Sequence, residues 1–249
     1  MTTPPGDSLL FEVAAPPTPV ERLLRLAGQY VQHNDTLDRL LRADSPSGPD
    51  AHTASAQQLA SATRAAVKAL TDERLFASRE LSDAVVRLQQ LAFLSDASIG
   101  QPLATARMLT ALAPAAAMHC ADTLALELRR RRRNATDAPT HQLAATHRTA
   151  LWEIGCGNVV ATSSQGRHYV HCLDEHVPIG TLRALETSGL AERDPKSAPS
   201  AYQAGPLQDR ILLTSVGTTA LAAVICSPSA PSTTAAPAAT ATKRTARSR

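Results

Sequence analysis

The chain has 249 residues and a formal net charge of +3, and 43% of its residues are hydrophobic although only 3% are aromatic. This length allows one or two domains with ordinary cores, and the few aromatic side chains argue against a large β-sandwich and favour helices packed through Leu, Val and Ala. The first ten residues lack the basic and apolar regions of a signal peptide, and no apolar run approaches the ~18 residues of a membrane span, so we expect a cytoplasmic protein with no membrane partner.

The excess positive charge is confined to two short stretches. Five arginines occupy positions 129 to 133, and four basic residues lie between Lys243 and Arg249. We interpret both stretches as flexible. Four cysteines show no paired short spacing and are expected to be free thiols in a reducing compartment: Cys120, Cys156, Cys172 and Cys226.

The N-terminal part is predicted to be helical after a disordered start. Residues 1–17 are rich in proline and lack periodicity, which indicates disorder. From Pro19, which suits the first helical position after Thr18, apolar residues recur at helical spacing for about six turns. A cluster of breakers at 44–50 ends this helix.

Two further helical tracts follow. Residues 53–97 contain neither Gly nor Pro, and we favour one long helix there over two helices broken near 71–78. After a turn at 99–102, a third tract runs from Leu103 to about Arg130. Pro114 should kink or divide it, because a proline inside a helix removes a hydrogen bond and clashes with the preceding turn.

We therefore predict an N-terminal antiparallel helical bundle, or coiled coil, over residues 18–133, followed by a linker at 134–139. A continuous helix over 53–97 would have an apolar stripe too long to be covered within one subunit. A homodimer through the N-terminal helices is the expected solution, and a monomeric bundle is the alternative.

The C-terminal part, residues 140–226, is predicted to combine helices and strands. A helix from about 140 to 154 stops at Gly155, and two β-rich runs about Gln165-Gly166 indicate a hairpin. A helix over 179–188 stops at Gly189, a strand follows at 190–193, another returns at 210–214, and a closing helix comes next. Residues 227–249 are predicted to be a disordered basic tail.

This part resembles a known family. Residues 181–194, TLRALETSGLAERD, and 212–221, LLTSVGTTAL, resemble the recognition helix, wing and last helix of bacterial winged helix-turn-helix regulators, including the MarR-like and PadR-like groups. The matching positions are Leu182, Leu185, Gly189, Leu190, Arg193, Leu213, Thr214, Gly217, Ala220 and Leu221. The family usually places a short helix before the recognition helix, where this chain has its strand-like run from 159 to 172.

The resemblance implies a DNA-binding transcriptional regulator or accessory protein, nucleoid-associated, whose partner is double-stranded DNA. The recognition helix would present Thr181, Arg183 and Thr187 to base edges, and a wing over 194–209, which carries Lys196, would lie along the backbone. Because residues 139–226 are nearly neutral, phosphate affinity would come from the basic tail, a second subunit or an Arg-rich hinge that consists of Arg129, Arg130, Arg131, Arg132 and Arg133. An equally good interpretation of these arginines is a solvated helix end.

Two other patterns carry less weight. The run from Glu153 to Asn158 is similar to the first motif of S-adenosylmethionine-dependent methyltransferases, but the preceding residues have helical spacing where that motif needs a strand. The histidines and cysteine at 168–176 are dense, yet they lack the ligand spacing of structural zinc.

The sequence therefore predicts a mainly α protein with a small β component, in which a winged helix-like α+β domain follows the bundle. We expect no enzyme activity, no cofactor, no catalytic residue and no metal site. The alternative function is a non-enzymatic adaptor or scaffold that uses the bundle and a winged helix without binding DNA.

Overall fold

The computed structural model describes residues 16–43, 52–73, 78–132, 143–164, 167–200, 202 and 205–227. The predictions for the linker at 134–139, for the tail beyond residue 227 and for nearly all of segment 1–17 therefore lie outside the described residues. In the described part the protein is mainly helical and has one small antiparallel sheet, as the sequence predicts.

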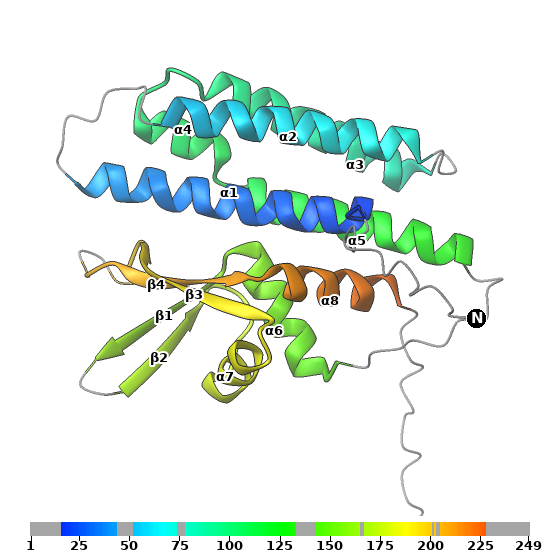
Figure 1. The fold of residues 1–249 in the computed structure, drawn as a ribbon. Coiled ribbons are helices and arrows are strands. Elements are labelled where there is room, and N and C mark those ends of the chain that lie inside the picture. The colour runs from blue at the N-terminus through cyan, green and yellow to red at the C-terminus, as the bar shows by residue number, and fades with distance from the viewer. Residues whose placement is uncertain are drawn as a thin grey trace, which may run out of the picture.

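Five helices make up the N-terminal part, and they are α1 (Pro19–Arg42), α2 (Thr53–Asp72), α3 (Arg79–Ala97), α4 (Leu103–Thr110) and α5 (Ala113–Arg132). Helices α1 and α3 each contact α2 and α5, so the four long helices pack side by side, and α4 contacts α1 and α3 (Figure 1). The coiled-coil geometry stays a prediction.

The first helix begins where the sequence predicts. The Thr18 hydroxyl accepts a hydrogen bond from the Glu21 backbone N–H at 3.2 Å, and the Glu21 carboxylate accepts one from the Thr18 N–H at 2.7 Å. Pro19 follows at the first helical position, where its missing N–H leaves no donor unpaired. This reciprocal cap satisfies two backbone donors and fixes the start of α1.

The prediction of one long helix over 53–97 is wrong. The chain forms two helices, α2 and α3, which pack against each other. The second begins at Ser78, whose extended backbone and hydroxyl cap the Leu81 N–H at 3.1 Å. A serine cap inside a stretch without Gly or Pro is enough to start a new helix, because it replaces a missing intrahelical partner. The expected homodimer was based on one uninterrupted apolar stripe over 53–97, and the two helices do not form such a stripe.

The third tract is divided as predicted, with α4 and α5 separated just before Pro114. Among the described residues, the stretch Leu103–Arg131 is apolar enough, by length and composition, to cross a membrane. Half of its apolar window is buried inside the protein, where α5 packs against α1 and α3. Arg107 and Asp122 interrupt this stretch, so it contains no uninterrupted apolar run of the length that a membrane span needs.

The C-terminal part consists of α6 (Ala145–Cys156), β1 (Val159–Ser164), β2 (Arg167–Cys172), α7 (Ile179–Thr187), β3 (Ala191–Ala198), β4 (Gln208–Leu213) and α8 (Ser215–Cys226). The four strands form an antiparallel sheet in the order β2-β1-β4-β3. The predicted hairpin, helix, returning strands and closing helix are thus all present. Helix α6 runs past Gly155 and ends at Gly157, which has the left-handed φ of 78° that glycine tolerates.

The two parts share one hydrophobic core. Buried side chains of α1, α3 and α5 belong to the same cluster as those of α6, α7, α8 and the sheet. Figure 1 shows α1 and α5 lying between the α2–α3 pair and the C-terminal elements. Polar contacts cross the same boundary, because the Thr219 hydroxyl of α8 donates to Glu21 of α1 at 2.6 Å and His119 of α5 lies edge-on to Trp152 of α6.

Candidate functional site

Helix α7 places the residues predicted to read DNA. Leu182 and Leu185, one turn apart, are buried in the core, while Arg183 and Thr187 are exposed and Thr181 is half-buried. Helical spacing produces this division, since positions three and four apart share one face. Arg183 and Thr187 therefore face outward as predicted, whereas Thr181 is less exposed than predicted, and whether these residues contact DNA stays a prediction.

The charges on α7 leave its outer face basic. Glu186 accepts two hydrogen bonds from the Arg193 guanidinium, at 2.9 and 3.1 Å, so the strand β3 neutralises that carboxylate. Arg183 forms no ion pair within the described part of the chain. An exposed guanidinium therefore projects from a face that is otherwise small and neutral: Gly180, Ala184 and Thr187.

The predicted wing contacts α1. Its loop contacts the last residue of α1, because the Arg42 guanidinium donates to the Gly205 carbonyl at 3.3 Å. Lys196 is exposed in β3 with a φ of 53°, and its backbone N–H donates to the Asp209 carboxylate at 2.9 Å. The strand bulges there, since the pairing with β4 shifts register between 194 and 198. Lys196 is thus the exposed cation that β3 offers.

The Arg-rich stretch is helical where the structure describes it. Residues 129–132 form the last turn of α5, so the expectation of a flexible hinge is wrong for them, and Arg133 lies outside the described residues. A helix C-terminus favours positive charge because its free carbonyls carry partial negative charge. Arg130 is also paired with Glu127, one turn earlier in the same helix.

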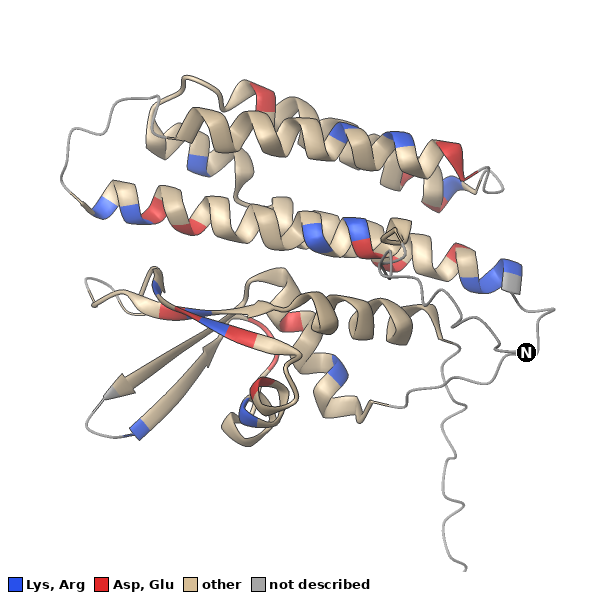
Figure 2. Ribbon diagram, in the orientation of Figure 1, with Lys and Arg blue, Asp and Glu red and all other residues tan. Residues whose placement is uncertain are grey.

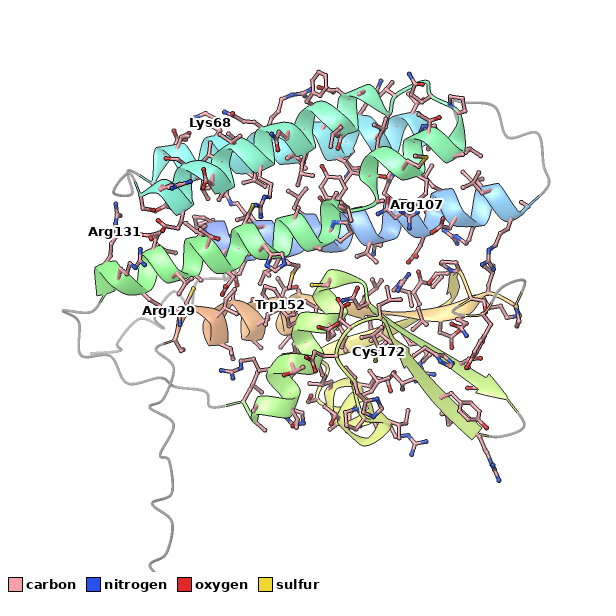
Figure 3. The ribbon with its side chains drawn as sticks, turned by 180° about the vertical axis from the view of Figure 1, so that it is seen from behind. Lys68, Arg107, Arg129, Arg131, Trp152 and Cys172 are labelled. Carbon is pink, nitrogen blue, oxygen red and sulfur yellow. The ribbon has the colours of Figure 1, made fainter. Side chains whose placement is uncertain are left out.

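Two of these arginines bind backbone carbonyls of other elements. The half-buried Arg129 donates to the Ser227 carbonyl just after α8, at 3.1 Å, and the Arg131 guanidinium lies 3.4 Å from the Glu73 carbonyl just after α2. Figure 3 shows both side chains at the same end of α5. Figure 2 places that basic end beyond α8, away from α7. The structure therefore does not bring Arg129 to Arg132 together with Thr181, Arg183 and Thr187.

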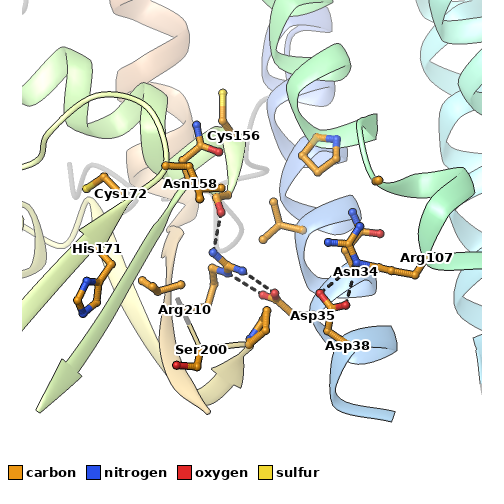
Figure 4. A pocket seen from close by; sticks show the side chains of 17 residues that line it. Asn34, Asp35, Asp38, Arg107, Cys156, Asn158, His171, Cys172, Ser200 and Arg210 are labelled. Carbon is orange, nitrogen blue, oxygen red and sulfur yellow. Dashed lines mark hydrogen bonds and ion pairs between the residues drawn. The ribbon is translucent and has the colours of Figure 1, made fainter. Parts of the chain in front are cut away.

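A pocket lined by both polar and apolar side chains lies where α1 and α4 meet the sheet. It has a volume of about 250 Å³ (Figure 4). At its centre the Arg210 guanidinium of β4 forms two hydrogen bonds to the Asp35 carboxylate of α1, at 2.6 and 2.7 Å. Its third nitrogen donates to the Gly157 carbonyl at 2.6 Å. Burial raises the pKa of the Asp35 carboxyl, and the bonds from Arg210 oppose that rise. This pair joins the two parts of the molecule.

A second ion pair lies beside the first. Arg107 of α4 donates from Nε to both carboxylate oxygens of Asp38, each at 3.0 Å. Nearby, the Asn34 side-chain amide donates to the Thr110 carbonyl at 3.0 Å. In both contacts a donor on one of the helices α1 and α4 meets an acceptor on the other, as polar groups at a packed junction require. The two ion pairs therefore form a polar junction between helices and sheet, while the buried Nε2 of His171, which also lines the pocket, has no hydrogen-bond partner among the described residues.

The thiols that line this pocket are poor nucleophiles. Burial, together with the nearby carboxylates of Glu153 and Asp174, raises the pKa of the Cys156 thiol to about 12. Burial also raises the pKa of the Cys172 thiol. The thiolate is the reactive form of cysteine, and at neutral pH both side chains stay protonated. Neither thiol is therefore an activated nucleophile for acyl or thiol transfer.

Comparison of the chain with protein-family models, with curated proteins and with solved structures finds no match. The winged-helix resemblance therefore rests on the residues of this sequence.

Sequence reasoning missed the polar junction. Asp35 and Arg210 are 175 positions apart, so no local spacing connects them. The available local signal was the run of three consecutive polar residues His33-Asn34-Asp35 in this amphipathic helix, which could indicate a buried polar contact without naming its partner. Of the histidines at 168–176, His168 has a local partner instead, since it forms a hydrogen bond with Ser163 across the hairpin at 2.8 Å.

Proposed function

We propose that the protein binds double-stranded DNA through α7 and acts as a transcriptional regulator or accessory protein of the nucleoid, in the cytoplasm. The observation that carries the proposal is the outer face of α7, where an exposed Arg183 lies among small side chains and the one acid of the helix, Glu186, is engaged by Arg193. This face has the shape and charge that contact with a polyanion needs.

The order of elements supports the proposal. Helix α7 leads directly into the antiparallel pair β3–β4, and α8 closes the domain, which is the order of recognition helix, wing and last helix that the resemblance implies. Where the family has a further short helix, this chain has the β1–β2 hairpin, whose strand β1 extends the sheet beside β4. A winged helix of this kind would have four strands.

The side chains fit groove readout in physical terms. The major groove admits one α-helix, and an Arg side chain can donate two hydrogen bonds to O6 and N7 of guanine. Thr181 and Thr187 add hydroxyl groups that can bond to either a base or a phosphate. Because Gly180 and Ala184 are small, the backbone of α7 can approach the base edges closely.

Affinity would be limited by the charge of this region. The exposed Lys196 supplies one phosphate contact next to α7, and acids such as Glu192 and Asp194 lie on the same strand. Each neutralised phosphate adds to the salt-dependent part of binding, so few contacts mean weak binding by one copy. The basic end of α5 would add to long-range attraction rather than to the same groove contact.

Selection of bound fragments from random duplex DNA tests the proposal, with wild type, Arg183→Ala and Arg39→Ala compared. Arg39 is exposed on α1, on the other side of β3 from α7, and serves as the matched loss of one positive charge. We expect wild type and Arg39→Ala to enrich a common sequence. Arg183→Ala should lose discrimination at one base position by about 10-fold, which is about 1.4 kcal/mol and lies within the roughly 1–3 kcal/mol of one bidentate contact. An equal effect of both variants would remove Arg183 from the base-reading role.

A non-enzymatic adaptor is the second candidate, favoured by the near-neutral C-terminal part and by the contact between the wing loop and α1. An adaptor would leave the random duplex pool unenriched. The same selection therefore distinguishes the two functions.

A further inference from the structure

The outer side of the α2–α3 pair is mostly polar, but it carries two large apolar side chains that the described residues leave uncovered. The inner sides of α2 and α3 pack on α1 and α5, and Figure 1 shows the pair at one edge of the molecule. On the outer side, Val86 is 50% exposed and Phe93 is 71% exposed. These two side chains are seven positions apart, which places them on one stripe of α3. A chain with three phenylalanines displays one of them here.

A groove of about 290 Å³ lies next to Phe93. Its walls are Arg64 and Val67 of α2 and Gln89, Ala92, Phe93 and Asp96 of α3. The same patch therefore carries both a projecting aromatic ring and a hollow beside it. A patch that contains its own knob and its own hole is complementary to a second copy of itself after a twofold rotation, which is the requirement for an isologous dimer.

The charges of this face are balanced. Arg64 pairs with Asp96 across the two helices, and Lys68 pairs with Asp72 along α2 at 2.7 Å. A face with matched positive and negative groups does not favour a polyanion or an acidic peptide. Under a twofold axis these two ion pairs can meet their copies with little repulsion between like charges, because each of their four charges already has a partner.

The size of the face also fits a second copy. Helices of 20 and 19 residues are about 30 Å long, and two such helices lie 8–10 Å apart. The resulting surface, roughly 30 by 20 Å before side-chain relief is added, is comparable with the ~800 Å² that each partner contributes to a standard interface.

We propose that the protein forms a twofold-symmetric homodimer in which Phe93 of each copy enters the α2–α3 groove of the other. The dimer does not depend on DNA binding. Its interface is the outer side of α2 and α3, and dimerisation doubles the number of α7 helices in one particle.

Sedimentation of the full-length protein over a micromolar concentration series tests the proposal, with wild type, Phe93→Asp, Phe93→Leu and Met108→Asp compared. Met108 is 79% exposed on α4, outside the face, and is the control for adding one surface charge. We expect wild type and Met108→Asp to dimerise alike. Phe93→Asp should raise the dimer dissociation constant by about 100-fold or more, since each dimer carries the change twice, and Phe93→Leu should raise it less.

Circular dichroism of each variant shows whether the fold is retained. We expect that it is, because substitutions at exposed positions usually change stability little. A wild type that stays monomeric at the highest concentration overturns the proposal. So does an oligomer whose dissociation constant is the same in Phe93→Asp and Met108→Asp.

Discussion

Gly217 shows at the scale of one residue why the family-like motif has a glycine. A Cβ atom built on Gly217 would lie 1.8 Å from the Leu190 carbonyl oxygen, so α8 passes directly over the start of β3. The neighbouring Thr214 fixes this approach, since its N–H donates to the same carbonyl at 3.2 Å and its hydroxyl caps the Gly217 N–H at 2.9 Å. The glycine of the motif is therefore needed because the backbones of Gly217 and Leu190 approach each other closely.

Gly217→Ala is predicted to lower the free energy of unfolding by about 3 kcal/mol or more, because backbone atoms must move to admit the methyl group. Gly28→Ala is the matched control. A Cβ at Gly28 meets nothing within 4 Å, and alanine inside a helix should raise the free energy of unfolding by roughly 0.5–1 kcal/mol. Urea denaturation measures both, and similar values for the two variants would contradict the close approach.

At the scale of the helices, two buried histidines form hydrogen bonds that connect α1, α2 and α3. His33 of α1 bonds through Nδ1 to Ser55 of α2, and His52, just before α2, bonds through Nε2 to the Ser98 carbonyl at the end of α3. The ring centroids are 6.3 Å apart. Burial, followed by the charges of His52 and Arg107, lowers the pKa of His33 from 6.5 to about 4.

This lowered pKa predicts a loss of stability in acid. The unfolded chain takes up a proton at His33 below pH 6.5, while the folded chain resists protonation until about pH 4. The contribution of His33 to the free energy of unfolding is therefore complete above pH 6.5 and falls as the pH drops from 6.5 to about 4. The loss attributable to His33 is roughly 3 kcal/mol. Urea denaturation at several pH values should show a shallower pH dependence for His33→Gln, while the exposed-site control His168→Gln keeps the wild-type slope. Equal slopes in all three proteins would contradict this role.

The elements were predictable to the extent that their signals are local. The start of α1, the stop at Gly189, the hairpin and the two faces of α7 follow from caps, turn residues and periodicity. The break between α2 and α3 was mispredicted, because Ser78 is a weaker signal than Gly or Pro. Contacts such as Asp35 with Arg210 depend on how distant elements meet, and sequence spacing contains no information about that.

At the scale of the whole molecule, one core unites the N-terminal helices with the C-terminal sheet, and the charged groups are distributed unevenly around it. The buried pair of Asp35 and Arg210 fixes β4 to α1, and Arg129 fixes the end of α5 to the residue after α8. Helix α7 contacts α6, β2 and β3 of this core and lies on the side of the C-terminal part that is away from α1 (Figure 1). In the proposed complex, placement of α7 on folded elements would reduce the ordering that DNA contact requires.

The affinity of the full-length protein for duplex DNA, measured by fluorescence anisotropy as a function of salt, tests the central claim most directly. The account predicts binding at low salt that weakens steeply between about 50 and about 200 mM, because phosphate contacts release counterions. Arg183→Glu should bind more weakly than Arg39→Glu at every salt concentration, since of these two positions only 183 would face the duplex in the proposed complex. The absence of duplex binding at low salt, or equal affinities of these two variants, would contradict the assignment of α7 as the DNA-binding helix.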